Sequence, residues 1–127
     1  DCYVSLHRAE GWGFGMIEAM NLKVPVVCTA YSGNMDFCSP EIAWLVDCKT
    51  VPVPPGDYVY ARADHRWAEP DIDDAARQMR AVRADPDQRH KRTAAAWRNV
   101  QENFSVKAVS LAYRKRIEEI LAARPRV

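Results

Sequence analysis

The stretch that decides the fold is residues 5–29, SLHRAEGWGFGMIEAMNLKVPVVCT. It continues from a short apolar segment, residues 2–6, and passes through three glycines within five positions before the helical pattern MIEAMNL. A second segment that is apolar and β-branched follows at residues 23–29. We interpret this order as a buried strand, a glycine-rich loop, a helix and a second buried strand parallel to the first.

The region that follows extends the same architecture. Residues 42–46, IAWLV, supply a third expected strand, and strands that alternate with short helical segments favour a parallel α/β sheet. Residues 50–70 are rich in proline and show no sustained period, which predicts a long irregular surface loop. Residues 1–70 are therefore expected to form an α/β region with a short parallel sheet.

Residues 71–127 are expected to form a C-terminal helical segment of the same domain. Asp71 is the expected N-cap of a helix at about 71–84, Pro86 starts a second that ends near Asn103, and Ser105 caps a third. The side chains expected on their buried faces are Ile72, Ala75, Ala76, Met79 and Val82 in the first, Ala94, Trp97 and Val100 in the second, and Val109, Tyr113, Ile117, Ile120 and Leu121 in the third.

The composition excludes several classes of protein. The chain has 127 residues, of which 48% are hydrophobic and 28% charged, so it is neither disordered nor collagen-like. Its apolar runs are far shorter than the roughly 18 to 20 residues that cross a bilayer, and no signal peptide opens it, so we expect a cytoplasmic protein. Because the chain enters a strand directly from Asp1 without an initiator Met, we also expect a piece of a longer protein, inactive alone.

The four cysteines, at positions 2, 28, 38 and 48, are far apart and include no CxxC pair. We interpret them as free thiols in apolar runs, with disulfides or a metal site as the less favoured alternatives. No metal site is predicted.

The net charge of +1 conceals an uneven distribution along the chain. Residues 1–71 hold 5 basic and 10 acidic side chains, and residues 72–127 hold 13 basic and 7 acidic ones. A basic helical half can attract nucleic acid or an anionic membrane. Here the arginines alternate with Asp, Glu and Ala, which favours a solvated helix face; nucleic acid is not an expected partner, and peripheral membrane contact stays an alternative.

The chemistry is concentrated in EGWGFGMIE, residues 10–18. Its glycines, Gly11, Gly13 and Gly15, let the backbone approach a ligand, and the start of the helix offers free N–H groups to an anion. Glu10 is expected in the loop and Glu18 in the first helical turn, where each carboxylate can accept hydrogen bonds from two vicinal hydroxyls. An anion site between two sugar-reading carboxylates fits a nucleotide diphosphate sugar. The GxGxG spacing does not fit the dinucleotide fingerprint.

This stretch resembles the E-x7-E signature of the retaining glycosyltransferases with two Rossmann domains, the B-type fold. The resemblance implies that residues 1–70 form a partial Rossmann-like donor-binding region, part of one of those two domains. The resemblance includes His7, the glycine–aromatic–glycine step at residues 13–15, EAM at residues 18–20 and PVV at residues 25–27. YSGNMDF, VPVPPGDY and WAEPD further along resemble a bacterial polysaccharide branch of that family.

The resemblance implies a role for each site residue. Glu10 would contact hydroxyls of the transferred sugar and be the catalytic candidate, Glu18 would hold the ribose, and His7 is a weaker sugar-binding candidate. Backbone N–H groups of the loop would touch sugar and phosphate, and no metal or other cofactor would be needed, since basic groups and a helix start stabilise the leaving diphosphate. The loop residues expected to bind substrate are Gly11, Trp12, Gly13, Phe14 and Gly15.

The resemblance also implies partners that this chain lacks. The glycan or lipid-linked acceptor would bind an N-terminal domain, and the basic groups would come from earlier in the Rossmann domain, a role that Arg8 and Lys23 do not fill. The expected open sheet edge favours self-association. Two positions depart from the pattern: Trp12 stands where Phe is commoner, and Ser32 replaces a glycine, which is tolerable if Ser32 is not at positive φ.

Other interpretations compete with a transferase. Glu10 and Glu18 could be ordinary surface carboxylates, the acid and nucleophile of a glycoside hydrolase, or part of a non-catalytic nucleotide-sugar or carbohydrate-binding module. His7 could be a general base, although a histidine at a strand end more often bonds the backbone. Among the aromatic residues, Trp44, Trp97 and Tyr113 are expected in the core, and Trp67 is as consistent with sugar stacking as with packing.

Overall fold

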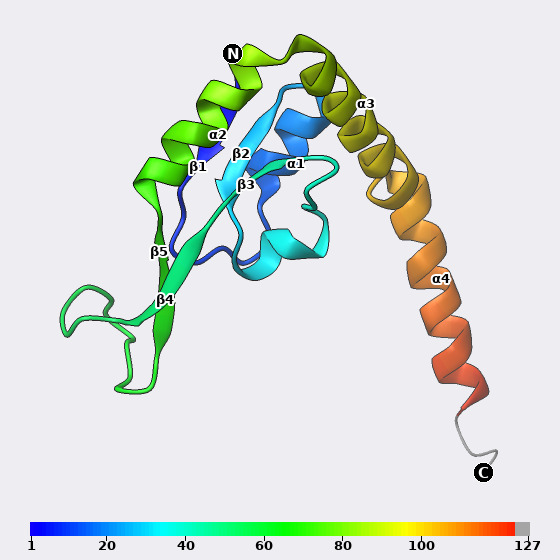
Figure 1. Cartoon of the computed structure of the whole chain (residues 1–127). Coiled ribbons are helices and arrows are strands. Elements are labelled where there is room, and N and C mark those ends of the chain that lie inside the picture. The colour runs from blue at the N-terminus through cyan, green and yellow to red at the C-terminus, as the bar shows by residue number, and fades with distance from the viewer. Residues whose placement is uncertain (124–127) are drawn as a thin grey trace.

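The computed structural model describes residues 1–123, whose elements follow the expected order (Figure 1). A parallel sheet contains β1 (Tyr3–Ser5), β2 (Val26–Thr29) and β3 (Trp44–Val46), in that order, with β2 in the middle. The helix α1 (Phe14–Asn21) connects β1 to β2, and a short 3-10 helix, η1 (Ser32–Asp36), follows β2. The predicted α/β class with a short parallel sheet is confirmed, with strands shorter than the predicted segments.

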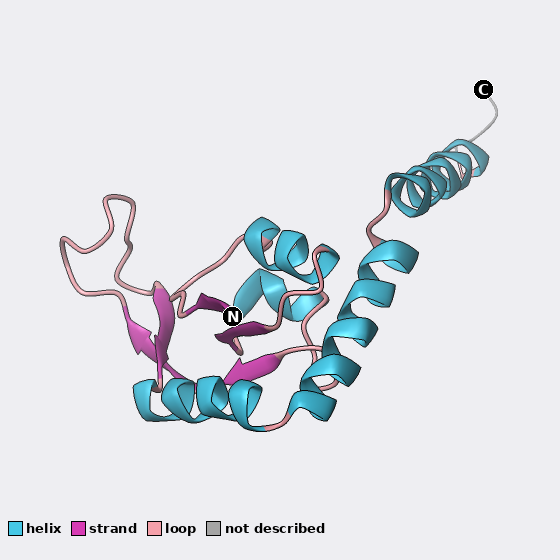
Figure 2. Cartoon of the chain, turned by 90° about the horizontal axis from the view of Figure 1, so that it is seen from above, coloured by secondary structure: helices cyan, strands magenta, loops and turns pink. Residues whose placement is uncertain are grey.

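The helices cover both faces of this sheet (Figure 2). After the sheet the chain forms α2 (Ile72–Ala84), α3 (Pro86–Asn103) and α4 (Val106–Ala122). Every residue of β2 is buried, and its side chains alternate between two hydrophobic clusters. Cys28 packs with Met16, Met20 and Val100 from α1 and α3, whereas Val27 packs against α2.

The predicted helix starts of the C-terminal half are confirmed by their caps. The carboxylates of Asp71 and Asp85 accept hydrogen bonds from the backbone N–H of the third residue of α2 and α3, and the hydroxyl of Ser105 accepts one in α4. Pro86 occupies the first position of α3, where its missing N–H costs no helical hydrogen bond.

The prediction of an irregular loop over residues 50–70 was wrong. This region contains a hairpin of two antiparallel strands, β4 (Cys48–Pro52) and β5 (Arg66–Pro70), and only residues 53–65 form a loop (Figure 1). Pro52 and Pro70 stand at the ends of the two strands, where a missing N–H does not interrupt the ladder. Prolines that suggested an absence of structure thus mark strand ends.

Several predicted core positions are exposed. In β1, expected to be buried, Tyr3 and Val4 lie on the edge of the sheet and are 38% and 39% exposed. On α2 the expected face is only partly covered, because Ala75 and Val82 are buried but Ile72 and Met79 are exposed. The amphipathic period placed these side chains on one side of each element without fixing how much of that side is covered.

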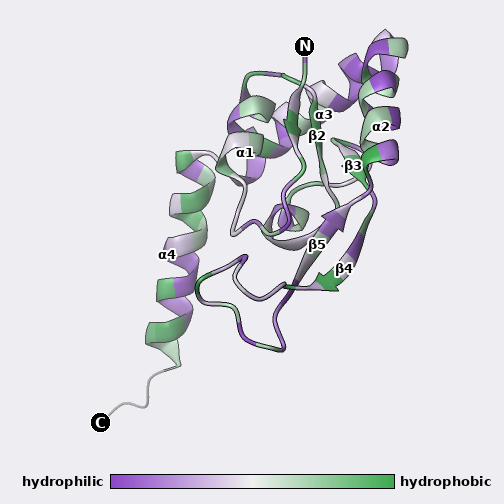
Figure 3. Ribbon diagram, turned by 90° about the vertical axis from the view of Figure 1, so that its left-hand side faces the viewer, coloured by the Kyte–Doolittle hydropathy of each residue, from purple (hydrophilic) through white to green (hydrophobic). Residues whose placement is uncertain are grey.

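The helix α4 differs most from expectation, since none of its residues is buried. It begins against the end of α3 and then extends away from the rest of the fold (Figures 1 and 3). Tyr113, expected in the core, is 69% exposed, whereas Trp44 is buried as predicted and Trp97 is half-buried. The predicted helical segment extended to residue 127, and residues 124–127 lie outside the described part of the chain.

Candidate functional site

The glycine-rich loop places a helix start beside the carboxyl end of β1. Gly13 is the N-cap of α1 and has a φ of 103°, a left-handed conformation that glycine adopts without strain. A Cβ there would also approach the ring of Phe37 within 3.0 Å. The backbone N–H groups of Phe14 and Gly15 donate no hydrogen bond to another described backbone group, so both are available to an anion.

Glu10 is fixed by the turn that follows β2. Its backbone N–H donates to the Ser32 hydroxyl at 2.8 Å, and its carbonyl accepts from the Gly33 N–H at 3.0 Å. Its carboxylate accepts a longer bond, 3.2 Å, from the backbone N–H of Trp12. The second carboxylate oxygen forms no hydrogen bond with a protein group in residues 1–123, which leaves it for an external donor.

Ser32 does have a positive φ, 69°, so the condition under which its replacement of glycine was expected to be tolerable is not met. The structure shows what offsets the strain, since its hydroxyl accepts the hydrogen bond from Glu10. Sequence reasoning missed this supporting role of Ser32, because nothing in the segment SGN indicates a partner 22 residues earlier.

Glu18 is an exposed residue of α1, and its predicted position in the first turn was wrong. The helix begins at Phe14, two residues before the segment from which it was predicted, so Glu18 falls in the second turn. It lines a hollow of about 330 Å³ together with Tyr3 and Gly15. Glu10 does not line this hollow, so a ligand that contacts both carboxylates must extend across the glycine-rich loop.

The two aromatic side chains of the loop differ in exposure, since Trp12 is half-buried and Phe14 is exposed. The indole of Trp12 packs against Phe37 and Phe104, with ring centroids 5.4 and 5.5 Å apart, while Phe14 is 73% exposed. The backbone N–H of Trp12 already donates to Glu10. The donors left in the predicted set are therefore those of its three glycines and of Phe14, and among them Phe14 and Gly15 belong to the start of α1.

His7 takes part in a hydrogen-bond network that joins the end of β1 to the segment after β2. Its Nδ1 lies 3.1 Å from the Ser5 hydroxyl, and its Nε2 lies 3.0 Å from the Tyr31 carbonyl and 3.1 Å from Asn34 Oδ1. Asn34 is fully buried, and its amide nitrogen donates to the Thr29 carbonyl, so we assign the proton of His7 to Nε2. Both ring nitrogens are used inside the protein, which favours a structural role over a general base.

The cations near the site have partners of their own. The guanidinium of Arg8 pairs with Glu69 at 2.8 Å and lies over the ring of Trp67, with 4.8 Å to its centroid. Lys23 Nζ lies 4.7 Å from the centroid of Trp97. Neither side chain is directed to the glycine-rich loop by these contacts, so the helix start supplies the positive potential there.

The four cysteines are free thiols, of which Cys28 and Cys38 are buried and Cys2 and Cys48 are half-buried. Cys28 and Cys38 lie together in the core with their sulfurs 3.8 Å apart. The hydrogen bond with Cys28 and burial raise the pKa of the Cys38 thiol, so it stays protonated. The described residues contain no group of three His, Cys, Asp or Glu side chains that could hold a metal ion.

No protein-family model, curated protein or solved structure matches the chain. None of the helices within residues 1–123 is long and apolar enough to cross a membrane.

Proposed function

We propose that the chain is the donor-binding part of a retaining glycosyltransferase, which transfers a sugar from a nucleotide diphosphate sugar to a glycan or lipid-linked acceptor. The observation that carries the proposal is the helix start of α1, whose free N–H groups at Phe14 and Gly15 lie in sequence between the carboxylates of Glu10 and Glu18. A diphosphate fits the N–H groups, and hydroxyls fit the carboxylates on either side.

The surroundings of each group favour different tasks for the two carboxylates. The backbone N–H and carbonyl of Glu10 are both hydrogen-bonded, and one of its carboxylate oxygens is free. A residue that positions a sugar hydroxyl requires both properties. Glu18 is exposed beside a hollow and suits the vicinal hydroxyls of a ribose. On this proposal the protein acts in the cytoplasm and needs no metal. An acceptor-binding N-terminal domain and further diphosphate-binding cations come from chain outside these residues.

A binding module without catalysis is the second candidate, and one observation favours it. Arg8 and Lys23 are engaged with Glu69 and Trp97, so the described residues near the loop supply no side-chain cation to a leaving diphosphate. Without such a cation the helix start alone can bind the donor, whereas breaking the glycosidic bond also needs the developing charge to be neutralised.

The test is ligand-observed NMR on the chain with uridine, guanosine, adenosine and thymidine diphosphate sugars. We expect at least one donor to bind, and Glu18→Gln to weaken it about tenfold through loss of a charge-assisted hydrogen bond to the ribose. Glu119→Gln is the matched control, because Glu119 is an exposed carboxylate on α4, and it should leave binding unchanged. Binding that is equally strong in both variants contradicts the proposal.

Catalysis separates the two candidate functions. A longer protein that contains this chain should transfer sugar with retention if the enzyme proposal holds, and Glu10→Gln should slow that transfer more than it weakens donor binding. Donor binding without any transfer or donor hydrolysis by the longer protein would favour the binding module.

A further inference from the structure

A second hollow, of about 350 Å³, lies between the segment before Glu10 and the loop of the β4–β5 hairpin. Its lining includes Trp67, the tryptophan for which the sequence did not decide between packing and sugar stacking. The residues that line it are Ala9, Val53, Tyr58, Asp64, His65 and Trp67, with Arg66 between the last two.

The hairpin is attached firmly to the segment that leads to Glu10. The Ala68 N–H donates to the Arg8 carbonyl at 2.8 Å, and the Arg8 side chain pairs with Glu69 at 2.8 Å. Arg8 also covers one face of the Trp67 ring. These contacts hold Ala9, the residue next to Glu10, at the wall of the hollow.

The lining combines aromatic surface with two opposite charges, those of Asp64 and Arg66. None of the ion pairs formed among residues 1–123 includes Asp64. Arg8 is paired with Glu69, whereas Arg66 lines the hollow and keeps its charge, because its Nη2 donates only to the neutral carbonyl of Thr50, at 2.7 Å. The charges of Asp64 and Arg66 cancel in the lining, so the hollow has no excess positive charge to attract phosphates or acidic sugars and suits a neutral ligand.

A neutral pyranose ring matches this lining. Its C–H face packs against aromatic side chains such as Tyr58 and Trp67, and its vicinal hydroxyls donate to a carboxylate such as Asp64. Ligand pockets commonly have this character, with apolar walls and a few polar groups that fix orientation. The volume, about 350 Å³, accommodates one or two sugar rings.

We propose that this hollow binds a neutral pyranose unit of the glycan acceptor, beside Glu10. The inference rests on the proposed function, which places the transferred sugar at Glu10, and it adds an acceptor subsite on this chain. The same ring chemistry could belong to the sugar of the donor. The acceptor is favoured because the proposed function places the donor sugar at Glu10, which does not line this hollow.

The experiment is saturation-transfer NMR on the chain with methyl pyranosides of glucose, mannose, galactose and rhamnose. We expect at least one glycoside to bind, and Tyr58→Ala and Asp64→Asn each to weaken it about fivefold, the effect of losing one modest contact. Tyr58 is 55% exposed, so its removal leaves the fold intact; the control is Tyr113→Ala on α4, where the side chain is 69% exposed. Glycoside binding should be unchanged in this control.

The outcomes separate this inference from the proposed function. Binding of glycosides that depends on Tyr58 but not on Glu18 supports the subsite, even if every nucleotide sugar fails to bind and the donor proposal falls. A lack of glycoside binding to the wild-type chain overturns the subsite, as does binding that Tyr58→Ala leaves unchanged. Nucleotide-sugar binding that Tyr58→Ala weakens as strongly as it weakens glycosides assigns the hollow to the donor and also overturns it.

Discussion

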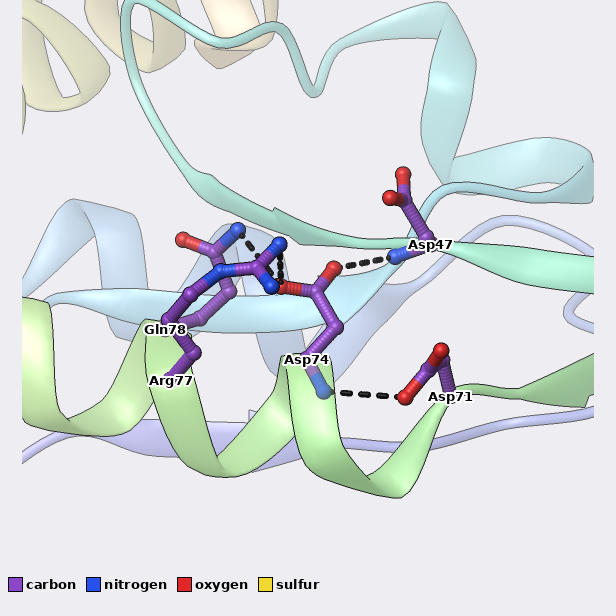
Figure 4. Close-up of polar contacts among 5 residues, drawn as sticks. All are labelled: Asp47, Asp71, Asp74, Arg77 and Gln78. Carbon is purple, nitrogen blue, oxygen red and sulfur yellow. Dashed lines mark hydrogen bonds and ion pairs between the residues drawn. The ribbon is translucent and has the colours of Figure 1, made fainter.

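The carboxylate of Asp74 accepts a hydrogen bond from the backbone N–H of Asp47 at 2.8 Å (Figure 4). Asp74 is only 3% exposed, and its other oxygen forms an ion pair with Arg77 at 2.6 Å and accepts a hydrogen bond from Gln78 at 3.2 Å. Its own backbone N–H donates to the N-cap Asp71. One buried side chain thus attaches the start of α2 to the chain between β3 and β4.

This contact makes Asp74 more important for stability than its neighbour. We expect Asp74→Ala to lower the free energy of unfolding by about 2 to 3 kcal/mol, because it leaves several donors without their acceptor. Asp73→Ala, which removes an exposed carboxylate from the same turn, should cost less than about 1 kcal/mol. Urea denaturation of the two variants checks the prediction, and equal midpoints would contradict it.

Ser32 combines backbone strain with a useful hydroxyl. We expect Ser32→Ala to destabilise the chain, since it keeps the positive φ and loses the hydrogen bond to Glu10. Ser32→Gly loses the same bond but relieves the strain, so it should be more stable than the Ala variant by about 1 kcal/mol. Thermal unfolding of both variants measures this difference. If Ala proved as stable as Gly, the left-handed conformation of Ser32 would be wrong.

Two glycines of the site region should respond differently to alanine. A Cβ on Gly33 would collide with the backbone carbonyl of Gly11, which cannot move aside as a flexible side chain can. We expect Gly33→Ala to cost about 2 kcal/mol or more of stability. Gly11→Ala places its Cβ in open space and should cost less than about 1 kcal/mol. Denaturant titration distinguishes them.

The exposed helix α4 should be the least protected helix. A helix of its length is marginal in water without tertiary packing, and none of its side chains is buried. We expect the amides of α4 to exchange with deuterium within seconds to minutes, while those of β2 stay protected far longer. Mass spectrometry of peptides from the two elements checks this. Equal protection would show that α4 is covered in solution.

The cysteines should differ in reactivity. Burial, with a smaller contribution from the charge of Asp47, raises the pKa of the Cys48 thiol. Removing that charge lowers the pKa and increases the thiolate fraction, so Asp47→Asn should speed alkylation of Cys48 by iodoacetamide at pH 8, by less than about threefold. Peptide mass spectrometry follows the rate, with half-buried Cys2 as an internal control whose rate stays constant. Buried Cys28 and Cys38 should not react in the folded chain.

The order of helices and strands was predictable from local sequence. The helix starts are indicated by Asp71 and Ser105, which each cap a backbone N–H three residues later, and by Pro86, which occupies a first helical position. The β-branched run of β2 indicates a buried strand. The β4–β5 hairpin was not predictable in this way, because its pairing joins residues up to 22 positions apart and proline obscured the strand pattern. The prediction that α4 is buried failed for a related reason, because an apolar helix face in the sequence does not identify the element that covers it.

In the candidate site, too, the features set by local sequence were predictable and those set by distant residues were not. The glycines and the two glutamates are visible in the sequence because their spacing is local. The parts that hold Glu10 come from the turn after β2, more than 20 residues away, and Ser32 and Gly33 carry no signal of that pairing. The state of His7 was equally hidden, since it depends on buried Asn34, which lies on η1.

The double attachment of the Glu10 backbone has a consequence for affinity. Its N–H and its carbonyl are both bonded to the turn at Ser32 and Gly33, so the root of the side chain is already ordered before any ligand arrives. A ligand that uses this carboxylate then pays only for fixing side-chain rotamers, roughly 0.5 to 1.5 kcal/mol, and not for immobilising a loop. The site is preorganised by a segment that need not touch the ligand.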